Sequence, residues 1–108
     1  MSKMKITFLG VGEGFDEDYT HTCMLVEAAG RRMLVDCGGT APPSVWHKSQ
    51  RPDYLDGIFI SHFHADHVFG LPALMKRMEE DGRTRPFYLF GPVGTQRSVE
   101  RLMEVAYQ

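Results

Sequence analysis

The chain has little of what marks a secreted, membrane-bound or strongly basic protein. Its 108 residues include only Cys23 and Cys37 as cysteines, too few for a disulfide framework. No apolar run reaches the length of a membrane span, and no signal-peptide core follows the positive N-terminus. A net charge of −2 does not favour nucleic acid or an anionic membrane as a partner. We therefore expect a cytoplasmic protein with reduced, buried thiols and no membrane contact.

What is present fits one small globular domain. Hydrophobic residues make up 43% of the chain and charged residues 24%, values ordinary for a folded soluble domain. A domain of this length buries only about 60–65% of the surface of its unfolded chain, so its core is modest. We expect a single domain over residues 1–108.

Period-2 patterns predict strands in the first third of the chain. Met4, Ile6 and Phe8 alternate with polar residues, as in a half-buried strand. Two further strands are predicted over 22–27 and 32–36, joined by a turn in which a glycine can take positive φ. These three strands should form an antiparallel meander.

Helical and strand patterns alternate in the rest of the chain. The predicted elements are a short helix from Ser44 ending by Pro52, a strand over 57–61, an amphipathic helix from about Leu71 to Gly82, a strand over 87–90 and a helix from Thr95. The order βββ(α)βαβα predicts an α/β fold with a mixed sheet and helices on one face.

Three of the five histidines lie in the six-residue window 62–67, directly after a short apolar run. His62 and His64 project to the same side of an extended backbone, while Asp66 and His67 follow where the chain turns toward a helix. Imidazole and carboxylate ligands suit zinc, iron or manganese, and four ligands in six residues favour an open site with more than one ion. The alternative is a polar cluster at a strand end that binds metal adventitiously.

The residues around this cluster resemble the signature of the metallo-β-lactamase-fold hydrolases. The H-x-H-x-D-H motif lies within the similar segment 55–72, and Leu34-Val35-Asp36-Cys37-Gly38 is similar to the family's L-x-D-x-G strand end. Gly70-Leu71-Pro72 and the segment 90–95 are most similar to the ribonuclease Z and phosphodiesterase branch. The resemblance spans about residues 4–105.

The resemblance implies a role for each polar residue of the motif. His62 and His64 would ligate a first metal ion, and Asp66 and His67 a second, with Asp66 also taking or giving a proton. Asp36 would lie beneath the site and orient the ligands; without the resemblance, a turn residue at a strand end is an equal interpretation. The implied cofactors are two zinc ions, with manganese or iron as alternatives, and the implied reaction is hydrolysis of an ester or phosphodiester.

The resemblance also implies that this chain is the N-terminal half of an αββα sandwich, an incomplete domain. The family's fold has two similar halves, and its remaining ligands come from the second half. The other histidines, His21 and His47, are expected to be surface or packing residues. Half a sandwich leaves an apolar sheet face bare, which is rare in a monomer. We therefore expect self-association or pairing with a missing C-terminal half.

The acidic loop 12–19 bears on the substrate, because the resemblance places it near the rim of the site. If Glu13, Asp16, Glu17 and Asp18 face the site, they disfavour a polyanion such as transfer RNA and favour a small ester, cyclic nucleotide or lactone; otherwise the loop is a solvated hairpin. One alternative function is a non-catalytic half-domain that binds metal weakly and serves as an assembly partner. Another is RNA processing, in which the anion patch would consist of Lys76, Arg77, Arg83, Arg85, Arg97 and Arg101.

Overall fold

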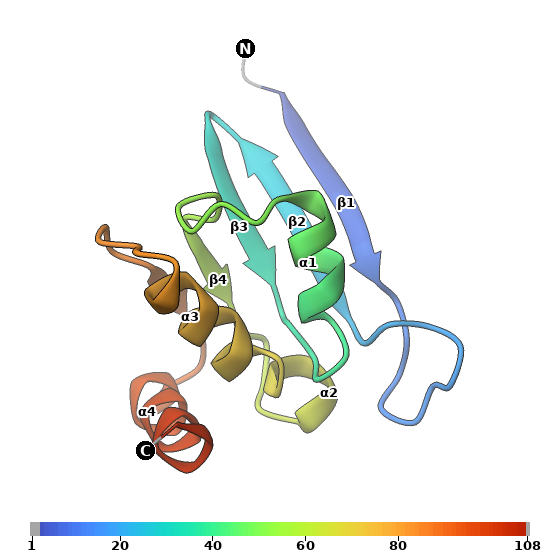
Figure 1. The fold of residues 1–108 in the computed structure, drawn as a ribbon. Coiled ribbons are helices and arrows are strands. Elements are labelled where there is room, and N and C mark those ends of the chain that lie inside the picture. The colour runs from blue at the N-terminus through green and yellow to red at the C-terminus, as the bar shows by residue number, and fades with distance from the viewer. Residues whose placement is uncertain (1–2, 108) are drawn as a thin grey trace.

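A five-stranded sheet with helices packed on one face forms the body of the protein in a computed structural model, which describes residues 3–107 (Figure 1). The strands are β1 (Met4–Gly10), β2 (Cys23–Ala28), β3 (Arg31–Val35), β4 (Gly57–Phe59) and β5 (Tyr88–Phe90). The helices are α1 (Pro42–Lys48), α2 (Ala65–Val68), α3 (Leu71–Glu80) and α4 (Thr95–Ala106).

The strands lie side by side in the order of the sequence. β1, β2 and β3 pair antiparallel, whereas β3, β4 and β5 pair parallel. The β2–β3 turn takes positive φ at Ala29 (52°) and Gly30 (75°), which allows a tight hairpin. α1 lies in the connection from β3 to β4 and α3 in that from β4 to β5, as parallel pairing requires. The predicted α/β class and the mixed sheet are confirmed.

The core lies between the sheet and the helices. Leu25, Leu34 and Ile58 on three neighbouring strands are at most 1% exposed. Side chains from the helices complete this cluster, among them Val45 of α1, Leu71 and Leu74 of α3 and Val99 of α4. The helices therefore bury this face of the sheet, which forms the hydrophobic core of the chain.

The opposite face of the sheet carries apolar side chains without cover, and we call it the open face. Strand pairing aligns two apolar rows on it: Ile6, Val26, Met33 and Tyr88, and Phe8, Met24, Val35, Phe59 and Phe90. Ile6 is 50% exposed, Phe8 65% and Phe90 53%. The bare sheet face expected for half of a sandwich is thus present. The alternation in β1 located the strand correctly, but its apolar side lies on the open face rather than in the core.

Several predicted boundaries differ from those of the structure. α1 begins at Pro42 rather than Ser44, because proline fits the first helical turn, and it ends at Lys48 rather than near Pro52. β4 ends at Phe59, two residues before the predicted end. The one-turn helix α2 was not predicted as a separate element. Within residues 3–107, no helix is long and apolar enough to cross a membrane.

Candidate metal centre

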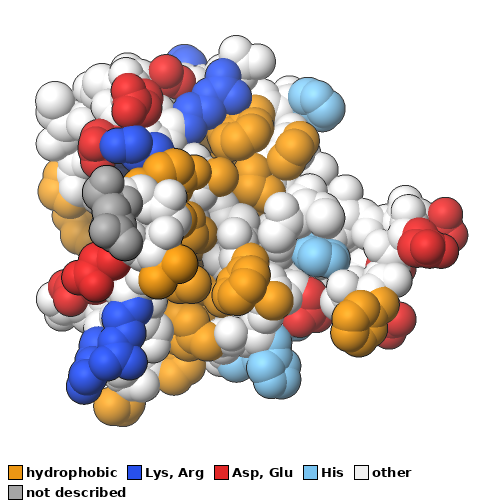
Figure 2. All heavy atoms as spheres, turned by 60° about the horizontal axis from the view of Figure 1, so that its bottom comes forward, with side chains coloured by type: hydrophobic (Ala, Val, Ile, Leu, Met, Phe, Trp, Pro, Cys, Tyr) orange, Lys and Arg blue, Asp and Glu red, His pale blue; other side chains and the backbone are white. Residues whose placement is uncertain are grey.

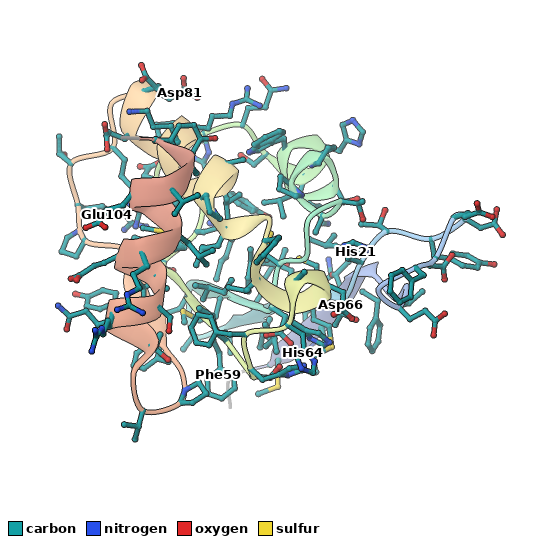
Figure 3. The ribbon with its side chains drawn as sticks, turned by 90° about the horizontal axis from the view of Figure 1, so that it is seen from below. His21, Phe59, His64, Asp66, Asp81 and Glu104 are labelled. Atoms are coloured by element: carbon teal, nitrogen blue, oxygen red, sulfur yellow. The ribbon has the colours of Figure 1, made fainter. Side chains whose placement is uncertain are left out.

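The predicted metal ligands lie at the end of β4, where the chain enters α2. Ile60 is buried and continues the hydrogen bonding of the strand through its N–H to the carbonyl of Phe90, 2.7 Å away. His64 is still extended (φ −66°, ψ 148°) and precedes the first residue of α2. Asp66 and His67 belong to that single helical turn. Figure 3 shows His64 and Asp66 at the same end of the molecule, beside the loop between β1 and β2.

All four side chains lie together. The ring centroid of His62 is 4.6 Å from that of His64 and 4.1 Å from that of His67. The Asp66 carboxylate is linked to His67, with 3.4 Å between Oδ2 and Nε2. His62, Asp66 and His67 are half-buried and His64 is exposed, so the cluster remains open to a ligand.

The carboxylate of Asp36 lies beneath the cluster and is only 3% exposed. Its Oδ2 is 2.7 Å from Nδ1 of His67 and accepts a hydrogen bond from the Ser61 hydroxyl at 2.6 Å. Its Oδ1 accepts the backbone N–H of Ser61 at 2.8 Å. Asp36 also has a left-handed backbone (φ 61°), which costs a non-glycine residue on the order of 1–3 kcal/mol. Strain of this kind persists where surrounding contacts fix the residue.

Two glycines let the segment after β3 approach α2 closely. The N–H of Cys37 donates to the carbonyl of His67 at 2.8 Å, and the N–H of Gly70 donates to the carbonyl of Cys37 at 3.0 Å. A Cβ on Gly38 would overlap the carbonyl oxygen of Asp66, and one on Gly70 would overlap the carbonyl oxygen of Gly38. These positions require glycine because the two backbones are in contact there. This contact holds α2, and with it the cluster, over Asp36.

The acidic loop between β1 and β2 reaches the rim of the cluster. A Cβ on Gly14 would lie 3.5 Å from Cγ of Asp66. The Asp16 carboxylate accepts the N–H groups of Tyr19 at 2.8 Å and Asp18 at 2.9 Å, and these bonds lower the pKa of Asp16. Asp16 therefore stabilises its own loop. Figure 2 shows acidic side chains gathered where the loop projects from the body.

The donor types fit a transition metal, but the set is not complete. Among the side chains of residues 3–107, no three of His, Cys, Asp or Glu are arranged so that they could hold an ion. His62 and His67 each use Nδ1 for a contact within the protein, to Ser61 Oγ at 3.0 Å and to Asp36, which leaves Nε2 as the candidate ligand atom of each ring. Two positioned imidazoles beside a carboxylate suit zinc, iron or manganese, and further ligands are needed to close the site.

The remaining histidines and the cysteines lie outside the cluster. His21 is hydrogen-bonded to Thr40 through its backbone N–H, and His47 is exposed on α1, as expected. Cys23 and Cys37 are free and fully buried, as predicted. A hydrogen bond with Cys23 and burial both raise the pKa of the Cys37 thiol. Cys37 therefore does not have the character of a ligating thiolate.

Sequence reasoning did not identify Ser61, Gly38 or Gly70 as parts of the site. Ser61 directly precedes the first histidine of the motif, and this position was the only feature of the sequence that could have indicated a role for it in the site. The two glycines lie 32 residues apart in the sequence, and their contact depends on the folded chain.

Comparison with known proteins agrees with this fold and motif. Residues 4–101 match the family model described as anti-Pycsar protein Apyc1. Ribonuclease Z of Methanococcus maripaludis strain C7 is 35% identical over 105 residues, which cover 96% of this chain and 34% of that protein. The crystal structure of human tRNase Z, short form, is 28% identical with a TM-score of 0.80, covering 100% of this chain and 41% of that one.

A metallo-β-lactamase fold protein from Bacillus subtilis shares the fold, with a TM-score of 0.77 at 22% identity over 91% of this chain and 40% of that one. The chain spans about a third of the length of the curated relatives it matches. It aligns with the N-terminal half of the metallo-β-lactamase fold, as the histidine motif predicted, and with the ribonuclease Z branch, to which Gly70-Leu71-Pro72 and the segment 90–95 were most similar. The chain belongs to the anti-Pycsar protein Apyc1 family of metallo-β-lactamase-fold proteins.

Proposed function

We propose that this chain supplies the first half of a binuclear metal site in a hydrolase that acts on a phosphodiester or ester. The observation that carries the proposal is the packing of three imidazoles, with centroids 4.1 and 4.6 Å apart, over the buried carboxylate of Asp36. His62 and His64 would hold one ion, and Asp66 and His67 the other. Zinc is the proposed metal, with manganese or iron as alternatives.

Asp66 and Asp36 would have different roles in the proposed reaction. The bound metal would supply Lewis acidity, which makes water a nucleophile at neutral pH and offsets charge that develops on the substrate. Asp66 would hold a proton at Oδ2, the oxygen that lies 3.4 Å from Nε2 of His67. Asp36 orients His67 from below through its 2.7 Å contact.

A small phosphodiester, such as a cyclic nucleotide, is the proposed substrate class. Most of the basic residues considered for binding a longer polyanion are already paired within the chain. Lys76 pairs with Glu79 at 3.2 Å, and Arg77 pairs with Asp81 at 3.4 Å. Arg83 and Arg85 also bind within the chain: Arg83 donates to backbone carbonyls, and Arg85 pairs with Asp56 at 2.9 Å. The acidic loop at the rim further disfavours a polyanion.

RNA processing is the second candidate, because relatives at 35% identity are named ribonuclease Z. RNA binding that depends on phosphate contacts weakens steeply as salt rises. Measuring RNA affinity against salt concentration tests this candidate: a steep slope supports an RNA substrate, and no measurable binding leaves the small phosphodiester.

The open face needs a partner in this proposal. A second half-sandwich would cover it, either the C-terminal part of a longer polypeptide or another copy of this chain, and would complete the ligands. An isolated chain of residues 1–108 is then expected to bind metal weakly and to show little turnover. If it never acquires activity with a partner, the non-catalytic assembly role replaces the enzyme. The two reduced cysteines support a cytoplasmic location.

Metal content tests the site directly. The double variant His62→Ala/His64→Ala should lose most of the zinc that the chain retains, since Asp66 and His67 alone provide too few ligands. His47→Ala, on the exposed surface of α1, is the matched control. Unchanged zinc by elemental analysis in the double variant would rule out the metal site.

Turnover tests the role of Asp66. In a full-length protein that contains this chain, Asp66→Asn should fold normally and lose hydrolysis of a chromogenic phosphodiester, because an amide does not accept the proton. Asp81→Asn is the control, since Asp81 lies at the far end of α3, away from the cluster (Figure 3). Near-normal turnover of the Asp66→Asn protein would remove Asp66 from the mechanism.

A further inference from the structure

A chain of hydrogen bonds through Asp36 and Ser61 links His67 to His62 and determines where each ring carries its proton. An ionised carboxylate only accepts hydrogen bonds, so the three groups bonded to Asp36 donate to it. Nδ1 of His67, 2.7 Å from Oδ2, is therefore the protonated nitrogen of that ring. In the neutral ring, Nε2 of His67 then keeps its lone pair, 3.4 Å from Oδ2 of Asp66.

The Ser61 hydroxyl determines in the same way which nitrogen of His62 is protonated. A hydroxyl has a single proton, and Ser61 donates that proton to Oδ2 of Asp36 at 2.6 Å. Its oxygen is also 3.0 Å from Nδ1 of His62. Since the proton is already in use, Ser61 accepts in this second bond and His62 donates from Nδ1. Nε2 of His62 also keeps its lone pair.

We propose that Ser61 is a positioning residue that holds His62 in the Nδ1–H tautomer. One buried carboxylate thereby sets both rings, His67 directly and His62 through the hydroxyl, so that each offers Nε2 to an ion. Imidazole coordinates metal through its unprotonated nitrogen, and the partner of the other nitrogen fixes which one that is. The inference rests on the proposed metal site, but the tautomer itself exists without metal.

The backbone around Asp36 supports this role. The N–H of Ser61 donates to Oδ1 of Asp36 at 2.8 Å, so Ser61 holds the carboxylate at both oxygens. Asp36 keeps a left-handed backbone with φ of 61°. The carboxylate is 3% exposed, so water does not readily replace these partners. Ser61 is thus fixed relative to Asp36 before any ion binds.

Nitrogen-15 NMR of the imidazole rings in the metal-free chain tests the proposal at a pH where the rings are neutral. The wild-type chain should show His62 and His67 as Nδ1–H. Ser61→Ala should remove the Nδ1–H preference of His62 and leave His67 unchanged, which also reports that the fold is intact. Ser61→Thr retains the hydroxyl and should restore the His62 signal. A wild-type His62 that is protonated at Nε2 overturns the proposal, as does a His62 tautomer unaffected by Ser61→Ala.

Zinc affinity is the second readout, measured by competition with a chromophoric chelator. Ser61→Ala should weaken binding about 10-fold, the lower end for loss of an outer-shell partner, and Ser61→Thr should recover it. A loss of affinity that Ser61→Thr does not recover contradicts the positioning role. The two readouts also distinguish failure of this inference from failure of the proposed metal site. If NMR shows the expected tautomers but the zinc content does not depend on His62 and His64, this inference holds and the metal site is rejected.

Discussion

The two faces of the sheet are built from alternate residues of the same strands, yet only one is a core. On the covered face, Leu25, Leu34 and Ile58 are at most 1% exposed beneath the helices. On the open face, Ile6 is 50% and Phe59 47% exposed, although both are as apolar as the core residues. Apolar alternation therefore predicts that one face of a strand is buried in the folded protein. It does not indicate whether the residues that bury it belong to this chain.

The candidate metal centre depends on the covered face for its rigidity. Asp36, Gly38 and Gly70 are buried, and the hydrogen bonds of Cys37 tie the end of β3 to α2. The ligand side chains above them remain half-buried or exposed. These contacts thus fix the positions of the candidate ligands, and the second unit proposed to cover the open face would supply the rest.

Removing a core side chain from the covered face should have the largest effect on folding. Leu34→Ala deletes a fully buried side chain, so we expect it to lower the free energy of unfolding by about 2–5 kcal/mol. That is a large part of the roughly 5–15 kcal/mol available to a domain. Ile6→Ala, on the half-exposed side of β1, should cost about 1 kcal/mol or less. Urea denaturation measures both, and equal losses would show that the open face is already covered.

Placing charge on the open face should affect association rather than folding. We expect the wild-type chain to have a mass above that of a monomer in light scattering, because its apolar rows need cover. Phe8→Asp should shift it to the monomer, since a carboxylate resists burial between two sheets. Val93→Asp is the control, because Val93 is fully exposed in the β5–α4 connection. A wild-type chain that remains monomeric at high concentration would show that the open face tolerates water.

The sequence was sufficient to predict those features that depend on residues close together in the chain. The period-2 residues of β1, the turn at Gly30 and the stripe of α3 each predicted an element that the structure contains. The histidine window predicted a cluster, and its four side chains do lie together.

Features that depend on tertiary contact could not be obtained in this way. The resemblance implied that Asp36 lies beneath the cluster, but Asp36 is 25 residues before Ser61 and 31 before His67, so its individual hydrogen bonds are visible only after folding. α2 has one turn, too short for a helical period to show. Pro42 and Pro43 read as loop residues because proline serves turns as well as first helical turns. The covered side of β1 could not be chosen, because burial depends on what packs against it.

Thiol reactivity compares the solvent exposure of the two faces, and the substitution that it needs should have the smallest effect on stability. Cys23 and Cys37 are fully buried, and the pKa of Cys37 is raised, so at neutral pH its thiol stays protonated and poorly nucleophilic. Their modification by a chromogenic disulfide should be slow and should accelerate in urea along with global unfolding. A cysteine introduced as Ile6→Cys should react promptly in the dispersed monomer and slow down when a partner covers the open face. Prompt reaction of Cys23 or Cys37 in the native chain would show that the covered face opens locally, and protection of the Ile6→Cys thiol in a monomer would show that the faces do not differ as described.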